Sequence, residues 1–202
     1  MYGSPFADCF VYTDGCSNQN RNQFLANALL HFSKQNNVEV TQKFLIKGHT
    51  QMEGDSVHAL IERKLKNKEV YSPYELVKYT KEAREKPFPY EAKYLYNDFF
   101  KDFSKISYYD SIRPGRKTGD PVVTDIHVLK YKPEGKIMYK MNYDDAYKDL
   151  PRRPQNVDPS SKPGALYKGR LSITEKKYKH LQELKAVIPR EYHSFYENLP
   201  YK

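Results

Sequence analysis

The first third of the chain alternates between short β-rich runs and amphipathic helices. The apolar pattern predicts a buried strand over residues 9–13, a helix over 20–34, a second strand over 38–47 and a second helix over 55–66. Two strands joined by a crossover helix are expected to run parallel, with a right-handed connection. Ligand sites in such units gather at the carboxyl ends of the strands. This alternation therefore predicts an α/β fold and indicates which sheet edge to search for a site.

The first predicted helix should bury one apolar stripe. The residues at helical spacing on that stripe are Leu25, Ala28, Leu29 and Phe32. Asn18 or Asn20 is placed to cap its N-terminus, and Asp55 or Ser56 is placed to cap the second helix. In the second helix, the residues expected to point inward are Val57, Leu60, Ile61 and Leu65.

The chain changes character after residue 70. Residues 72–85 predict a third, basic helix, and residues 122–143 predict two strands around a Pro-Glu-Gly turn, which is typical of a β-hairpin. Residues 113–121 have the composition of a loop. A last amphipathic helix is expected over 172–188, with Ser172 and Glu175 in capping-box spacing.

Four regions follow from these composition changes. We expect a partial α/β core over residues 1–70, a basic α+β region with helix, loop and hairpin over 71–149, a Pro-rich linker over 150–171, and a C-terminal helix and tail over 172–202.

The net charge of +9 is unevenly distributed along the chain. Residues 1–60 carry a net charge of −1, and residues 61–202 carry +10. Such a surplus suits a polyanion, so nucleic acid, most simply DNA, is the expected partner. Arg113, Arg116 and Lys117 form a cluster for contacts to the nucleic-acid backbone. An ordinary solvated basic surface is the alternative.

The aromatic residues are mostly tyrosine, with 19 Tyr and no Trp. Tyrosines interleaved with basic residues can stack on bases, and the candidates are Tyr108, Tyr109, Tyr131 and Tyr139. The alternative is that these four side chains are packing residues.

Cysteine content and hydropathy bear on the compartment. Two cysteines are too few for a disulfide scaffold, which favours a reducing compartment. No apolar run approaches the roughly 20 residues needed to span a membrane, and the N-terminus lacks the pattern of a signal peptide. We therefore expect a nuclear or cytoplasmic protein that does not enter the membrane, of unknown oligomeric state.

Three carboxylates lie where a metal site of this fold would form. Asp14 follows the first strand, Asp55 falls in the first turn of the second helix, and Glu62 lies about 10 Å further along that helix at 1.5 Å per residue. Paired Mg²⁺ or Mn²⁺ ions held by oxygen ligands catalyse phosphoryl transfer. Geometry prefers Asp14 and Asp55 as the shared metal ligands, with Glu62 as the alternative.

Each of these residues also has an ordinary structural interpretation. Asp-Gly after a strand is a common turn, Asp55 can be a helix cap, and Glu62 can be surface charge. A zinc site built from Cys16, His49 and His58 is a weaker hypothesis.

Taken together, the motifs resemble a known group of proteins. "YTDGCSNQNRNQFLANALLHF" and "KFLIKGHTQMEGDSVHALIERKLKN", with "IRPGRKTGDP" and "LQELKAVIP" later in the chain, are similar to the RNase H-like core of transposon-derived, DDE transposase-like proteins and to its C-terminal part. The resemblance implies a mixed sheet flanked by helices and a triad of acids for DNA strand transfer. By position, Asp14 matches the second acid and Asp55 the third, with Glu62 as the alternative.

The chain departs from this pattern at its start. Thirteen residues precede Asp14, and they cannot supply the central strand that carries the first acid. Asp8 lies just before the strand that ends at Asp14, so it cannot take that part. We therefore expect a truncated transposase relative.

Three hypotheses about function follow. The first is a catalytically inactive, transposase-derived fragment that binds nucleic acid through its basic C-terminal part. The second is a Mg-dependent nuclease or strand-transferase completed by a missing strand or by a partner. The third is a protein-interaction module without chemistry.

Overall fold

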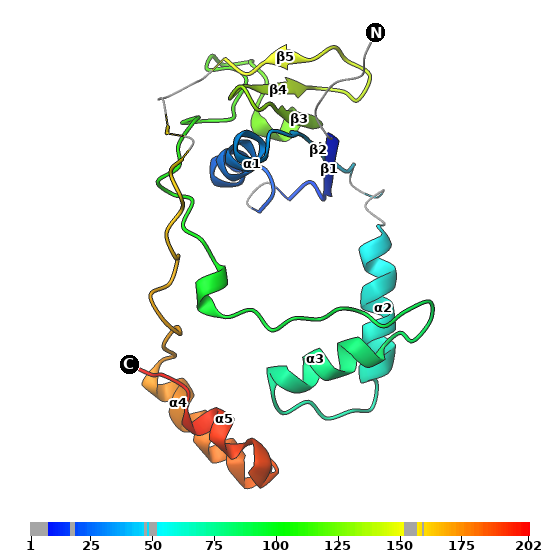
Figure 1. Ribbon diagram of the computed structural model, residues 1–202, viewed down its shortest axis with the longest axis vertical. Coiled ribbons are helices and arrows are strands. Elements are labelled where there is room, and N and C mark those ends of the chain that lie inside the picture. The colour runs from blue at the N-terminus through cyan, green and yellow to red at the C-terminus, as the bar shows by residue number, and fades with distance from the viewer. Residues whose placement is uncertain (1–7, 17–18, 47, 49–51, 152–156, 159) are drawn as a thin grey trace. The chain divides into compact units, whose positions relative to one another are not determined.

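The computed structural model describes residues 8–16, 19–46, 48, 52–151, 157–158 and 160–202. The chain forms two compact units, and each is assembled from two separate stretches (Figure 1). The first unit comprises Met1–Thr50 and Asp102–Gly164, and the second comprises Gln51–Lys101 and Ala165–Lys202. Each unit is described by itself below.

The first unit is built on a five-stranded mixed sheet. In chain order the elements are β1 (Asp8–Thr13), α1 (Gln23–Asn36), β2 (Glu39–Phe44), β3 (Val128–Tyr131), β4 (Ile137–Lys140) and β5 (Lys148–Asp149). The strands follow the order β1-β2-β3-β4-β5 across the sheet. β1 and β2 are parallel, and every later neighbour is antiparallel. The predicted strand–helix–strand unit and the predicted hairpin are confirmed, and the fold is mixed α/β. The expectation that the first strand is buried is wrong, because β1 lies at the edge of the sheet and alternate side chains on it are exposed.

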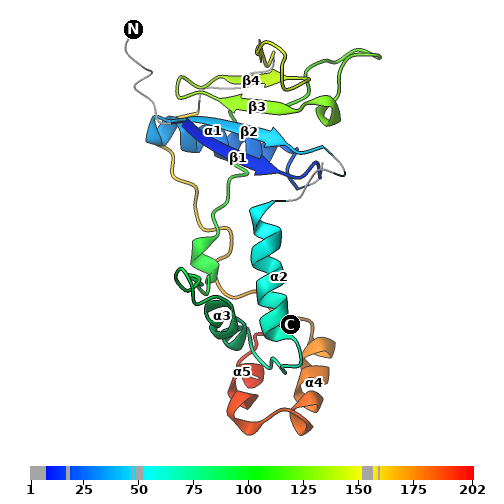
Figure 2. The ribbon, with the colours of Figure 1, turned by 90° about the vertical axis from the view of Figure 1, so that its right-hand side faces the viewer.

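Helix α1 lies against one face of the sheet (Figure 2). Asn22 caps its N-terminus by accepting a hydrogen bond from Leu25 N, so the expectation that Asn20 is the cap is wrong, and Asn18 lies outside the described residues. Asn37 ends the helix with φ 53°, a left-handed conformation that asparagine tolerates.

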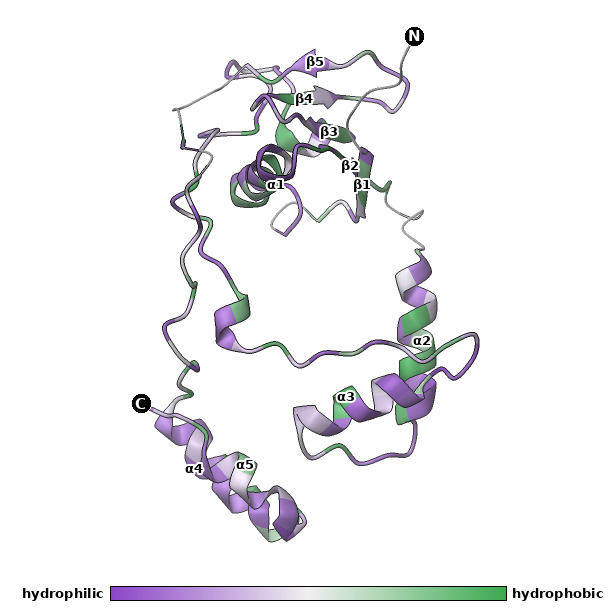
Figure 3. Cartoon of the chain, in the orientation of Figure 1, coloured by the Kyte–Doolittle hydropathy of each residue, from purple (hydrophilic) through white to green (hydrophobic). Residues whose placement is uncertain are grey.

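The buried face of α1 differs from the predicted stripe. Phe32 is 46% exposed, and the buried side chains are those of Ala26, Asn27, Leu30, His31 and Ser33. Three of these five residues are polar, and Figure 3 shows that α1 carries hydrophilic as well as hydrophobic stretches. An apolar pattern alone could not place this face, because the polar side chains on it are paired by distant segments.

Those pairings involve loop backbone and a tyrosine hydroxyl. Asn27 Nδ2 donates to Tyr109 O and Asn27 Oδ1 accepts from Tyr109 N, each at 2.9 Å. His31 Nδ1 lies 3.0 Å from the Tyr108 hydroxyl. The Ser33 hydroxyl lies 2.6 Å from Val38 O. Buried polar groups need such partners, so α1 is fixed in position by specific hydrogen bonds as well as by apolar packing.

The hydrophobic core of the first unit fills the space between α1 and the sheet. Its fully buried side chains include Leu30, Val40, Phe44, Ile126, Leu129, Tyr131 and Ile137. Gln42 is also fully buried, and its Oε1 accepts a hydrogen bond from the Tyr131 hydroxyl at 2.7 Å. The two polar groups satisfy each other inside the core.

The second unit is mainly helical. Its helices are α2 (Glu53–Leu65), α3 (Pro73–Glu82), α4 (Glu175–Glu183) and α5 (His193–Glu197). The predicted helices over 55–66, 72–85 and 172–188 are confirmed, although the last is shorter and its cap is Thr174, whose hydroxyl accepts from Lys177 N. Met52 is the N-cap residue of α2, so Asp55 and Ser56 are not.

The Glu75 carboxylate links separate segments of the second unit. Among the described residues, every buried hydrophobic side chain belongs to the first unit. Glu75 accepts hydrogen bonds from Tyr71 N at 2.7 Å, Ser72 N at 3.2 Å and the Tyr192 hydroxyl at 2.7 Å. Burial disfavours the Glu75 charge, but these donors outweigh burial and lower the pKa of Glu75. This carboxylate joins α3 to the segment before α5.

The two compact units differ from the four regions expected from composition. The sequence-based division places cuts after residues 70, 149 and 171, whereas each compact unit takes one early and one late stretch. In the part of the chain that the structure describes, no helix combines the length and apolar character needed to cross a bilayer.

Candidate nucleic-acid interface

The face of the sheet opposite α1, called the outer face below, carries alternate residues of every long strand. On β1 the cysteine, valine and threonine at positions 9, 11 and 13 lie on the α1 side, and Asp8, Phe10 and Tyr12 lie on the outer face. Phe10 is 54% and Tyr12 is 52% exposed. Two large rings are therefore presented to solvent at the edge of the sheet.

The strand register aligns lysines with these rings. Tyr12 pairs with Lys43, Lys43 with Val128, and Val128 with Lys140, which makes one transverse row across four strands. In the next row Phe10 pairs with Thr41, Thr41 with Lys130, and Lys130 with Met138. Because side chains alternate with period two, all three lysines project from the outer face.

Lys43 and Lys140 lie against aromatic rings. The Lys43 ammonium is 5.5 Å from the centre of the Phe10 ring and 5.6 Å from that of Tyr12. The Lys140 ammonium is 4.4 Å from the Tyr147 ring and lies 3.1 Å from Tyr143 O. Cation–π contacts of this kind hold a lysine in place without neutralising its charge.

Lys130 is partly neutralised by a carboxylate. Its ammonium lies 2.9 Å from Glu39 Oε2, and Lys132 is 3.7 Å from the other oxygen of Glu39. The hydrogen bond from Lys130 lowers the pKa of Glu39. Burial disfavours the charge on Lys130, but the hydrogen bond to Glu39 and the charges of Glu39, Tyr147 and Asp8 together outweigh burial and raise the lysine pKa. The positive charge of the outer face is therefore carried chiefly by Lys43 and Lys140.

These residues surround a shallow concavity of about 180 Å³. The loop after β4 forms one wall, where the Tyr143 hydroxyl donates to Phe44 O at 2.5 Å. The lining side chains are Asp8, Phe10, Thr41, Lys43, Val128, Lys130, Lys140, Tyr143 and Tyr147. A concave surface of lysines and exposed rings can contact phosphates and stack on bases at the same time.

Asp14 follows β1 and forms a turn. Its Oδ1 accepts hydrogen bonds from Cys16 N at 3.3 Å and from the Asn20 side-chain amide. The aspartate is exposed and closes the connection that leads into α1. The described contacts of Asp14 are thus those of a turn residue.

Asp55 and Glu62 both lie on α2, in the second unit. Asp55 Oδ2 accepts a hydrogen bond from Met52 N at 2.7 Å, which satisfies one donor at the start of the helix. Glu62 is exposed on the same helix, and so is His58. Asp14 belongs to the first unit. The two predicted metal ligands, Asp14 and Asp55, therefore lie in different units.

The described residues give no support to a metal site. Within the described ranges, no three His, Cys, Asp or Glu side chains gather closely enough to hold an ion. His49 lies outside the described residues. The residues around Asp14 therefore fit a turn rather than a pair of Mg²⁺ ions, and the catalytic and metal roles of Asp14, Asp55 and Glu62 stay predictions.

The predicted basic cluster lies in an ordered loop of the first unit. Asp120 Oδ2 accepts hydrogen bonds from Arg116 N at 2.8 Å and Lys117 N at 2.7 Å, and this carboxylate organises the loop. The Arg116 and Lys117 side chains are exposed, whereas Arg113 is half-buried. Nucleic-acid contact by these three residues stays a prediction.

The tyrosines proposed for stacking are mostly inaccessible. Tyr108, Tyr109 and Tyr131 are all buried, so a stacking role for these three residues is wrong. Tyr139 is partly buried against the core, and its stacking role stays a prediction. The residues that the prediction missed lie on the outer face. The signal was the alternation of polar with apolar residues in "VLKYK" and, less regularly, in "EVTQKF", which places Lys130 and Lys43 on the face opposite the core.

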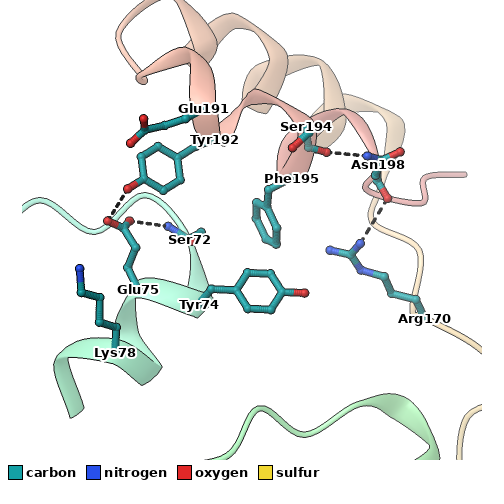
Figure 4. A pocket seen from close by; sticks show the side chains of 10 residues that line it. All are labelled: Ser72, Tyr74, Glu75, Lys78, Arg170, Glu191, Tyr192, Ser194, Phe195 and Asn198. Atoms are coloured by element: carbon teal, nitrogen blue, oxygen red, sulfur yellow. Dashed lines mark hydrogen bonds between the residues drawn. The ribbon is translucent and has the colours of Figure 1, made fainter. Parts of the chain in front are cut away.

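The second unit contains two adjoining cavities. The larger, about 540 Å³, lies between Glu75 and Tyr192 on one side and Arg170 and Asn198 on the other (Figure 4). The smaller, about 310 Å³, shares Tyr74 and Arg170 with it. Both volumes fall in the range of about 300–1,000 Å³ that is typical of ligand sites.

Comparison with known proteins gives one match. A family model described as "Domain of unknown function (DUF7869)" matches residues 7–108, which is half of the chain. Neither the search of curated proteins nor the search of solved structures found a match.

Proposed function

The chain belongs to the DUF7869 family, a domain of unknown function, and from this premise we propose that it binds nucleic acid through the outer face of its sheet. The observation that carries the proposal is the convergence of Lys43, Lys130 and Lys140 with exposed rings on one concave surface. Phosphates would bind to the lysine ammonium groups, and an unpaired base would stack on Phe10 or Tyr12.

The resemblance of the motifs to transposon-derived proteins supports nucleic acid, and DNA in particular, as the partner class. In this proposal the first unit is part of an RNase H-like core that no longer performs strand transfer. The parallel β1–α1–β2 arrangement is compatible with such a core. The proposal assigns the chain binding without a catalytic step and places it in the nucleus or cytoplasm.

The charge distribution supports this proposal as well. The first unit has 16 Lys and Arg against 12 Asp and Glu, and the second has 18 against 13, so each carries a positive net charge. Binding should therefore weaken as salt is added, because each neutralised phosphate releases a counterion.

The test is the salt dependence of affinity for a labelled oligonucleotide, measured by fluorescence anisotropy. In the variant Lys43→Gln/Lys140→Gln, two phosphate contacts are lost. The slope of log K against log salt should fall by about 1.8 for duplex DNA or about 1.4 for a single strand. Affinity at low salt should fall about tenfold.

A matched variant controls for net charge. Lys105 and Lys176 are exposed and lie outside the lining of the concavity, so Lys105→Gln/Lys176→Gln removes the same two charges from other surfaces. This control should retain nearly all of the affinity. Equal loss in both double variants would mean that net charge, rather than the outer face, determines binding, and would refute the proposal.

A further inference from the structure

The smaller cavity of the second unit is an aromatic groove. Its lining side chains are Tyr74, Tyr94, Leu95, Tyr96, Asn97, Phe100, Tyr167, Arg170 and Leu171. Several of these large residues face solvent: Tyr96 is 58% exposed and Leu171 is 62% exposed. Exposed apolar side chains gathered around a hollow are typical of a binding site.

The tyrosines of the groove form an ordered stack. The rings of Tyr74 and Tyr94 are nearly parallel, with centres 4.8 Å apart, and the Tyr96 ring lies 5.0 Å from that of Tyr94. The neighbouring Tyr74 hydroxyl raises the pKa of Tyr96. The stack therefore offers flat ring faces with hydroxyl groups beside them.

Arg170 gives the groove its charge. Among the described residues that line it, Arg170 is the charged one. Its Nη1 donates to Asn198 O at 3.2 Å, and Figure 4 draws this hydrogen bond as a dashed line. The guanidinium lies 5.5 Å from the centre of the Phe195 ring. A guanidinium has five N–H donors, so an arginine held at this point can still bind a phosphate through two of them.

We propose that this groove binds an unpaired nucleotide of a single-stranded nucleic acid, with the base stacked on the tyrosines and a phosphate on Arg170. The inference rests on the proposed function, and it adds a second site and a preference for single strands. Charge complementarity selects this occupant, because a lining with a cation and without a carboxylate suits an anionic strand. A proline-rich peptide is the competing occupant, since such peptides also use aromatic grooves.

The test compares a labelled single strand with a duplex of the same length, again by fluorescence anisotropy. Tyr96→Leu and Arg170→Gln should each lower single-strand affinity about tenfold, because one stacked base or one phosphate contact is lost. Duplex affinity should stay unchanged. Phe88→Leu, at a ring that is 62% exposed and outside the groove, should leave both affinities unchanged.

A photocrosslink locates the contact and does not depend on the variants folding. A single strand carrying 5-bromodeoxyuridine should crosslink, on irradiation, to the segments 94–100 or 167–171, as identified by peptide mass spectrometry. Crosslinks confined to the first unit, with unchanged affinity in both groove variants, would overturn the inference and leave the proposed function standing. Absence of any binding to nucleic acid would overturn both.

The peptide alternative is tested on the same variants. A proline-rich peptide that binds the native chain and is weakened by Tyr96→Leu, while single-strand affinity is unaffected, would replace the nucleotide with a peptide as the occupant. Competition between the peptide and the single strand, with crosslinks in the groove, would support the inference.

Discussion

Replacing Asn27 with alanine should destabilise the first unit far more than an ordinary surface change. Asn27 is 2% exposed, and its amide makes two hydrogen bonds of 2.9 Å to the backbone of Tyr109. Alanine would leave both Tyr109 groups buried and unpaired. Each unsatisfied group costs about 1–3 kcal/mol, so the free energy of unfolding should fall by about 2–5 kcal/mol.

Asn36→Ala is the matched control for this prediction. Asn36 belongs to the same helix, but it is exposed, and its amide makes a single bond to Phe32 O at 2.9 Å. Its loss should change the free energy of unfolding by about 0.5 kcal/mol or less. Alanine has a higher helix propensity than asparagine in both variants. Part of this stabilisation therefore cancels when the two variants are compared.

Two measurements check the prediction. Urea unfolding followed by circular dichroism gives the change in the free energy of unfolding. Hydrogen exchange of the peptide that contains Tyr109 reports the local effect, because the Tyr109 N–H donates to Asn27. The reasoning is refuted if Asn27→Ala and Asn36→Ala unfold at the same urea concentration and the Tyr109 amide keeps its protection.

Three further predictions concern the first unit. Burial lowers the pKa of His31 in the folded chain. The free energy of unfolding should therefore decline as the pH falls below about 6.5, the ordinary pKa of histidine, toward the lowered pKa of the folded state. Urea titrations from pH 7 to pH 5 should show a smaller decline for His31→Gln. Gly115→Ala should cost about 1–3 kcal/mol, because an added Cβ would lie 2.2 Å from Asp120 Cβ, whereas Gly164→Ala meets no atom within 4 Å and should melt like the native chain. Asp14→Ala should cost about 1 kcal/mol through the lost turn, and Asp14→Asn less. A Mg²⁺-dependent rise in melting temperature that Asp14→Asn abolishes would instead favour the metal assignment.

Local sequence patterns were sufficient to predict most strands and helices of both units. Alternation and turn residues identified β1, β2 and the β3–β4 hairpin, because strand pairing there depends on near neighbours and on period two. Helix periodicity likewise identified α1 to α4, with ends displaced by a few residues where the caps were misassigned.

The buried face of α1 could not be predicted from periodicity. Polar residues such as Asn27 and His31 are buried because Tyr108 and Tyr109, nearly 80 residues later, supply their hydrogen-bond partners. Hydropathy assigns such residues to solvent, since it cannot account for a partner that is distant in the chain.

The candidate site shows the same division. Sequence alone determined that the β2, β3 and β4 segments each carry a lysine, which period two places on the face opposite Phe44, Tyr131 and Tyr139. Only the tertiary structure decided that β2 lies beside β3, which aligns Lys43, Lys130 and Lys140 with the rings of β1. The physical reason is that a residue's direction depends on local backbone geometry, whereas its neighbours across a sheet depend on which strands pair.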